Sequence, residues 1–315
     1  MLETITRSNA EIARHVEVPS SCPFVIVAVA PCRSGTTAQL RVFAEAGAQA
    51  HYQPFKAILR EMEQGRDLDF RIPEGDDQTI FIKETVGPYN KPQSTLDPIA
   101  ILLEAGFPIE KVRLIPMLRQ PLATFSSWIK VNDAVRKYFN GAIPVEDLLE
   151  NLITSYKTVD EIRQRAINAG IPTTTFVQEA LRDNSPRQVV QSLLTASGLR
   201  FSPTSVKGWR NLVPMGEPGS NIVFHPIGTE PKKDEGSQVI HQILLHSDGL
   251  QYISKEDREI DVLTAEQAGQ LANAGLYEHY EKFRKAAQAD LGVGICQSTE
   301  YQGFMRRKSQ ALKGG

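Results

Sequence analysis

The chain has few cysteines, no excess of one charge and no long apolar run. Its 315 residues include three cysteines, Cys22, Cys32 and Cys296, and the formal net charge is only −2. Thiols this few and scattered exclude a disulfide framework and a cysteine-based metal site, and they suit a reducing cytoplasm. The small net charge gives no reason to expect nucleic acid as a partner, although a local basic pocket stays open.

Membrane insertion and secretion are not indicated either. The apolar segment 24–30 is too short to span a bilayer, and no basic segment leads directly into it as in a signal peptide. We therefore expect a cytoplasmic protein without a membrane partner. Because 41% of the residues are hydrophobic, the chain is long enough to bury a large core, and we interpret 1–315 as a single domain.

Short apolar segments alternate with amphipathic ones along the first two thirds of the chain. The segment 24–30 is rich in β-branched residues, which is typical of a parallel strand covered on both faces. Amphipathic helices are expected after it, from Pro121, and between Pro144 and Gly170. The pattern predicts an α/β fold, a three-layer P-loop-like sandwich with a central, mostly parallel sheet of about five strands and helices on both faces. The expected strands are 24–30, 48–52, 79–83, 112–118 and 173–177.

Other segments depart from this regular alternation. Residues 1–22 form an N-terminal extension, and 213–254, rich in proline, glycine and charge, is interpreted as a loop-rich lid or acceptor-binding insertion. A long helix is predicted over 263–287, and 306–315 is predicted to be a flexible tail. Pro116 cannot donate to a neighbouring strand, so we expect it at a sheet edge or a strand end.

The segment APCRSGTT, residues 30–37, joins the first strand to the first helix and is suited to hold an oxyanion. Backbone N–H groups at such a turn have no helical partner, and the helix dipole adds positive potential. Gly35 permits the tight turn and Arg33 brings a fixed charge. Thr36 and Thr37 offer hydroxyls. A P-loop for ATP or GTP has lysine where this chain has Thr36, so a nucleotide triphosphatase is not favoured.

The loop resembles the phosphosulfate-binding loop of sulfotransferases, in which a basic residue precedes Ser-Gly-Thr-Thr. The match is made by Arg33, Ser34, Gly35, Thr36 and Thr37. A second motif of that family follows a later strand and consists of an arginine, a proline two positions on and a serine in the next helix. Arg119, Pro121 and Ser127 match it in order and spacing. The resemblance implies that Arg119 and Ser127 hold the 3′-phosphate of the nucleotide.

Two further segments are similar to elements of the same family. Residues 176–202 are similar to a strand that ends in an acidic residue and leucine, here Glu179 and Leu181, and leads through a helix to a glycine turn. The segment KGWRN, 207–211, is similar to a late element that lies over the bound nucleotide. The resemblance implies nucleotide contacts from Lys207, Gly208, Trp209 and Arg210, and a role as a packing anchor is the alternative for the indole.

The resemblance also implies a reaction that needs no metal. A sulfuryl group passes from 3′-phosphoadenosine 5′-phosphosulfate (PAPS) to an acceptor oxygen or nitrogen, and 3′-phosphoadenosine 5′-phosphate (PAP) leaves. Fixed donors stabilise the charge that develops on the bridging oxygen, and we expect Arg33 in this role. Lys83 is expected to help hold the transferring group. The pair of Lys83 and Glu84, and the segment HYQPFK with His51, are similar to elements of a bacterial branch. His51 or Glu84 is the expected base.

Two other functions stay open on the sequence alone. One is a P-loop small-molecule kinase that uses ATP and magnesium. The other is a non-catalytic nucleotide-binding homologue, because Gln53 and Thr85 depart from the family patterns. For the sulfotransferase we expect a small-molecule acceptor, such as a bacterial metabolite or natural product, and a monomer or homodimer.

Overall fold

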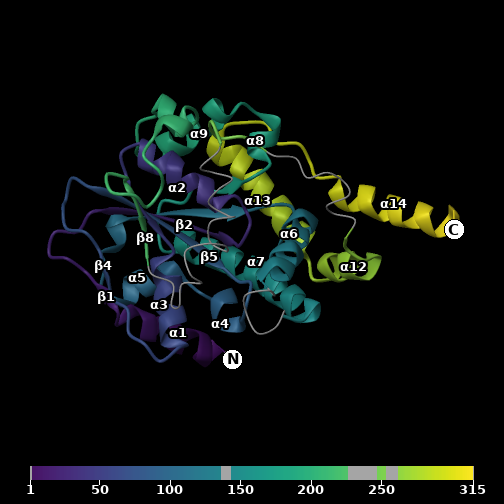
Figure 1. Cartoon of the computed structure of the whole chain (residues 1–315), viewed down its shortest axis with the longest axis horizontal. Helices are drawn as coiled ribbons and strands as arrows, with labels where there is room; N and C mark the ends of the chain where they lie inside the picture. The colour runs from purple at the N-terminus through teal and green to yellow at the C-terminus, as the bar shows by residue number, and fades with distance from the viewer. Residues whose placement is uncertain (1, 136–142, 226–246, 253–261, 315) are drawn as a thin grey trace.

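The centre of the molecule is a six-stranded sheet in the order β7-β6-β2-β5-β3-β8 (Figure 1). The computed structural model describes residues 2–135, 143–225, 247–252 and 262–314. Each pair of neighbouring strands in this sheet is parallel. The predicted α/β fold with a mostly parallel sheet is confirmed, with one strand more than the five expected. The strands are β2 Phe24–Pro31, β3 Gln49–Tyr52, β5 Thr79–Val86, β6 Val112–Leu118, β7 Phe176–Val177 and β8 Ile222–Phe224.

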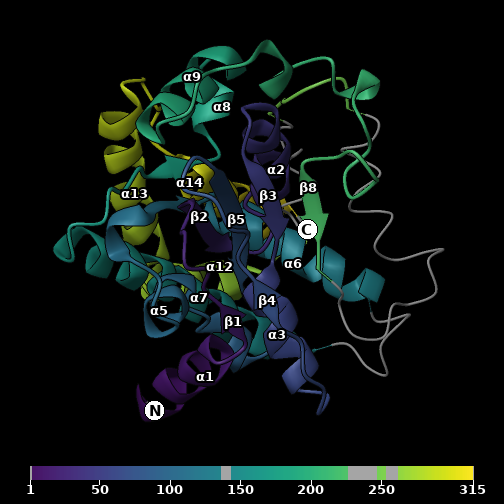
Figure 2. The ribbon, with the colours of Figure 1, turned by 90° about the vertical axis from the view of Figure 1, so that its left-hand side faces the viewer.

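Helices cover both faces of the sheet (Figure 2). On one face α2, Thr36–Glu45, packs against β3 and β5, and Phe43 stacks on Phe81 with ring centroids 4.1 Å apart. On the other face α7, Val145–Asn168, packs against β2 and β6, and α3, Pro54–Met62, packs against β5. Further helices are α4 Lys91–Ser94, α5 Pro98–Glu104, α6 Pro121–Val135, α8 Ala180–Asp183 and α9 Pro186–Ala196, with short 3-10 turns η1 Ile109–Lys111, η2 Pro203–Ser205 and η3 Trp209–Asn211.

Pro116 lies inside the sheet, opposite Val29 of β2, and the expectation of an edge strand is therefore wrong. Leu114 and Leu118 both bond to the segment 172–178 on the other side of β6. Because residues two apart in a strand point the same way, the missing N–H of Pro116 faces that side too. The ladder is interrupted there, between a single bridge at Leu114 and the short β7. The proline is tolerated because no donor is needed at this point.

Residues 2–22 of the predicted N-terminal extension pack onto the domain. Its helix α1, Leu2–Ala13, contacts α5, and Ile12 and Val16 are buried in the core. The short strand β1, Val16–Glu17, pairs in parallel with β4, Phe70–Arg71. This segment therefore packs beside α5 and α3 rather than extending away from the domain.

The segment 213–254, interpreted as a lid, contributes a strand to the main sheet. Ile222 of β8 is opposite Ala50 of β3, and this pairing makes β8 the outermost strand. Residues 226–246 and 253–254 lie outside the described part of the chain. The lid role of the whole segment therefore stays a prediction.

The C-terminal region is more helical than the sequence led us to expect. The helix predicted over 263–287 is divided at Gly275, which has a left-handed φ of 79°, into α12, Ala265–Asn273, and α13, Leu276–Leu291. Helix α14, Glu300–Gly314, takes in most of 306–315, for which we expected a flexible tail. Across the described ranges, no helix is long and apolar enough to cross a membrane.

Candidate anion-binding site

The loop between β2 and α2 has the backbone of an anion cradle. Arg33 and Gly35 both have left-handed conformations, with φ of 71° and 81°. This is uncommon for a residue with a side chain, and it turns the chain sharply before the first amides of α2. The hydroxyl of Ser34 is buried and has no hydrogen-bond partner in the described structure. A Cβ at Gly35 would lie 3.3 Å from the side chain of Gln178.

The two arginines and the serine predicted to bind the nucleotide meet at this loop. Arg33 Nε donates to Ser127 Oγ at 3.1 Å, and Arg119 Nη1 donates to the carbonyl of Arg33 at 3.3 Å. The carbonyl of Arg119 accepts a hydrogen bond from Tyr156 at 2.5 Å, which fixes the end of β6. Arg119 is 6% exposed, and its Nε has no partner among the residues described. Residues about 90 positions apart are thus brought to one point. At least one hydrogen-bond donor there, Arg119 Nε, is unused among the described residues.

Lys56 belongs to the same region and was missed by the sequence reasoning. Helix α3 begins at Pro54, after Gln53 in a left-handed conformation, so that Lys56 lies in its first turn. Its ammonium donates to the carbonyls of Thr85 and Gly87 and lies 3.5 Å from the sulfur of Cys32. The side chain is fully buried, and burial lowers its pKa to about 8. Proline at the start of a helix that follows a strand was the signal that could have found this lysine.

Lys83 faces the same side of the sheet as α2. Its ammonium lies 4.1 Å from the centre of the Tyr52 ring, on the neighbouring strand. Burial is the main cause that lowers its pKa to about 7, and the charge of Lys56 adds to this effect. Burial thus disfavours the charged form of both ammonium groups, and an anion bound nearby would favour it.

Glu84 points to the opposite face of the sheet from Lys83, because successive side chains of a strand alternate. One of its oxygens accepts from the amides of Phe55 at 2.8 Å and Lys56 at 3.4 Å, so the carboxyl group caps α3. The other oxygen is buried and lacks a partner in the described part of the chain. Burial raises the pKa of Glu84 to about 7. The two side chains of the expected pair therefore lie on opposite faces of the sheet, and their roles stay predictions.

His51 is buried on that same opposite face, in an aromatic environment. Its Nδ1 lies 3.0 Å from Nε2 of His225, and its ring makes an edge contact with Phe70. Burial, followed by the charge of His225, lowers the pKa of His51 to about 3. A histidine with this pKa is a weak base at neutral pH. The surroundings of His51 thus favour it less than Glu84 for proton removal, and the identity of the base stays a prediction.

The late segment 207–210 is held by contacts outside the loop. Lys207 bridges to Gly249, the amide of Gly208 donates to the carbonyl of Asp248 at 2.7 Å, and Arg210 is exposed. The indole of Trp209 is buried and donates to the carbonyl of Thr204 at 2.9 Å. These bonds make Trp209 an anchor for the segment that packs on α2. Nucleotide contacts from Lys207, Gly208, Trp209 and Arg210 stay predictions.

The sequence matches no family model and no curated protein. Among solved structures, the chain is similar to the sulfotransferase domain from the curacin biosynthetic pathway. The two share 14% identity with a TM-score of 0.39, and the comparison covers 80% of this chain and 99% of that domain.

Proposed function

We propose that the protein is a sulfotransferase that uses PAPS as donor and a small molecule as acceptor. The observation that carries the proposal is the convergence of Arg33, Arg119 and Ser127 beside the anion cradle. Both Ser34 Oγ and Arg119 Nε are buried without a partner in the described structure. Buried polar groups normally have partners, so unused donors at one point indicate a ligand that accepts hydrogen bonds.

The proposed nucleotide position follows from the two motifs. The loop 33–37 holds the 5′-phosphosulfate with backbone amides and hydroxyls, and Arg119 and Ser127 hold the 3′-phosphate. A nucleotide with phosphates at both ends matches one arginine within the loop after β2 and a second that follows β6. ATP carries its phosphates at one end only, and the site lacks the lysine that reaches them in a P-loop.

The proposed transfer is in line. The acceptor oxygen or nitrogen attacks sulfur while the bond between sulfur and the bridging oxygen breaks, PAP leaves, and the acceptor proton passes to a base. Arg33 stabilises the charge that develops on the bridging oxygen, and Lys83, when protonated, holds the transferring group. Of the two candidate bases, which both lie across the sheet from Lys83, Glu84 has the pKa nearer to neutral, about 7.

The test is turnover. The purified protein is incubated with PAPS and a panel of phenols, alcohols and amines, and PAP release and the sulfated product are followed by chromatography and mass spectrometry. The proposal expects PAP release that depends on an acceptor and does not need magnesium. Phosphate transfer from ATP with magnesium would replace it by a kinase function, and nucleotide binding without any turnover would indicate a non-catalytic homologue.

A further inference from the structure

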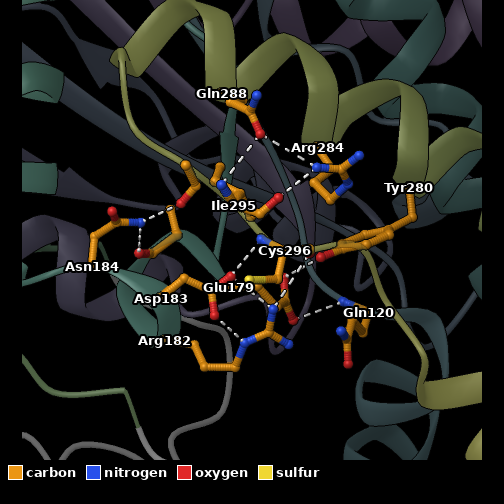
Figure 3. A network of polar contacts seen from close by, with 12 residues as sticks. Gln120, Glu179, Arg182, Asp183, Asn184, Tyr280, Arg284, Gln288, Ile295 and Cys296 are labelled. Carbon is orange, nitrogen blue, oxygen red and sulfur yellow. Dashed lines mark hydrogen bonds and ion pairs between the residues drawn. The ribbon is translucent and has the colours of Figure 1, made fainter.

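A segment near the C-terminus lies against the end of the strands that carry the site. This segment, residues 292–300, is called here the C-terminal strap and connects α13 to α14. The amide of Cys296 donates to Asp183 at 2.8 Å, Arg284 donates to the carbonyl of Ile295 at 2.5 Å, and Asn184 donates to the carbonyl of Gly294 at 2.7 Å (Figure 3). The strap is thus fixed by side chains from α8 and α13.

The strap places the carboxyl group of Glu300 on the first turn of α6, a helix of 15 residues. Glu300 Oε1 accepts from the amide of Ala123 at 3.1 Å. In the amide orientation that satisfies both its polar atoms, Gln120 donates to Glu300 Oε1 at 3.2 Å and accepts from Ser298 at 3.1 Å. The carboxyl group therefore takes up helix amides immediately after Arg119, where a phosphate held by that arginine would also find donors.

Unused polar atoms remain on both sides of this contact. Glu300 Oε2 and Arg119 Nε are buried and have no partner within the described ranges. The two atoms are not bonded to each other, although the charge of Arg119 acts on Glu300. Each is therefore available to a ligand near the start of α6.

A second carboxyl group lies beside the first. Glu179 is fully buried and accepts from the amide of Gln120 and from the hydroxyl of Tyr280, each at 3.1 Å (Figure 3). Burial and then the charge of Glu179 raise the pKa of Glu300 to about 8, against the lowering effect of Arg119 and the α6 amides. The other charged or titratable groups that face this pair are Arg182 of α8, Tyr156 of α7, Tyr252, and Tyr277 and Tyr280 of α13.

We propose that Glu300 is a proton-dependent gate on the phosphate position at Arg119, where the neutral carboxyl group admits a phosphate and the ionised one excludes it. The inference rests on the proposed function, because the phosphate is the 3′-phosphate of the nucleotide. An ionised Glu300 competes for the same amides of α6 and repels the ligand at close range. A neutral Glu300 removes the repulsion and can donate a hydrogen bond from Oε2 to the phosphate.

The experiment measures PAP affinity by calorimetry between pH 7 and pH 9 for the wild type and for Glu300→Gln. For a group with a pKa of about 8, ionisation weakens binding by about tenfold over this range. We expect this tenfold component in the wild type and its loss in Glu300→Gln. Glu300→Asp should retain it, and Glu266→Gln, an exposed glutamate on α12, should behave as the wild type. Lys56 and Lys83 also titrate here, but equally in every variant.

Adenosine 5′-phosphate is the matched ligand because it lacks the 3′-phosphate. Its affinity should have the same pH dependence in the wild type and in Glu300→Gln. If Glu300→Gln does not fold, the wild type alone decides. At pH 8.5, binding of PAP should be accompanied by uptake of more protons than binding of adenosine 5′-phosphate. The uptake is measured by calorimetry in buffers of different ionisation enthalpy. Equal uptake, or equal pH dependence of PAP binding in both proteins, overturns the gate. Failure of PAP to bind any variant at any pH overturns the proposed function, and the gate with it.

Discussion

Substitution of Arg119 should weaken ligand binding strongly while leaving the stability of the fold nearly unchanged. Among the described residues its guanidinium donates one hydrogen bond, to the carbonyl of Arg33 at 3.3 Å, and its Nε has no partner. Arg119→Met should therefore cost about 1 kcal/mol of stability or less, the net value of one neutral-acceptor hydrogen bond. A charge-assisted contact to phosphate contributes about 2–3 kcal/mol, so PAP affinity should fall by roughly 30–150-fold.

The assay is calorimetric titration with PAP and with adenosine 5′-phosphate, together with thermal unfolding. The loss of affinity should be large for PAP and small for adenosine 5′-phosphate, which lacks the 3′-phosphate. Arg113→Met is the matched control, since Arg113 lies near the start of β6, the strand that Arg119 follows, and donates to the carbonyl of Ala196. Unchanged PAP affinity in Arg119→Met, combined with a large loss of stability, would refute the assignment of Arg119 to the ligand.

Three further predictions concern the loop and the two candidate bases. Glu84→Gln should remove the rise of turnover with pH near 7, because the carboxyl group must be ionised to accept a proton. An unchanged pH profile of turnover in a steady-state assay would exclude Glu84 as the base. Stability should fall below pH 6.5, since His51 and His225 have lowered pKa values of about 3 and about 4 in the folded state and take up protons on unfolding. His51→Phe should recover about 1.4 kcal/mol at pH 5.5 in urea unfolding, and an unchanged slope would contradict the burial argument. Gly35→Ala, strained by its left-handed φ and by Gln178 at 3.3 Å, should lose about 1–2 kcal/mol of stability and weaken PAP binding, whereas wild-type values would refute the cradle.

The parallel sheet and the meeting of the two arginine motifs are predictable from the sequence for a physical reason. The β-branched apolar segments of β2 and β6 identify strands buried on both faces. Residues that follow parallel strands gather at one edge of the sheet, so Arg33 and Arg119 meet there although they are 86 positions apart. The proximity follows from topology and needs no knowledge of side-chain packing.

The sixth strand and the C-terminal strap could not be found in this way. Strand β8 has three residues in a segment rich in proline and glycine, and it exists because Ile222 finds a partner in Ala50. Glu300 reaches the first turn of α6 from 177 positions away, through bonds made by α8 and α13. Neither feature leaves a periodic pattern in the sequence, because both depend on long-range contacts. The division of Lys83 and Glu84 between two faces, by contrast, follows from strand alternation and was predictable.

The central claim is that this site binds a nucleotide with a 3′-phosphate. The most direct measurement is calorimetric titration of the protein with PAP, with adenosine 5′-phosphate and with ATP plus magnesium, at pH 7. The account predicts micromolar binding of PAP that is lost without the 3′-phosphate and indifferent to magnesium. Preference for ATP with magnesium, or equal binding of PAP and adenosine 5′-phosphate, would contradict it.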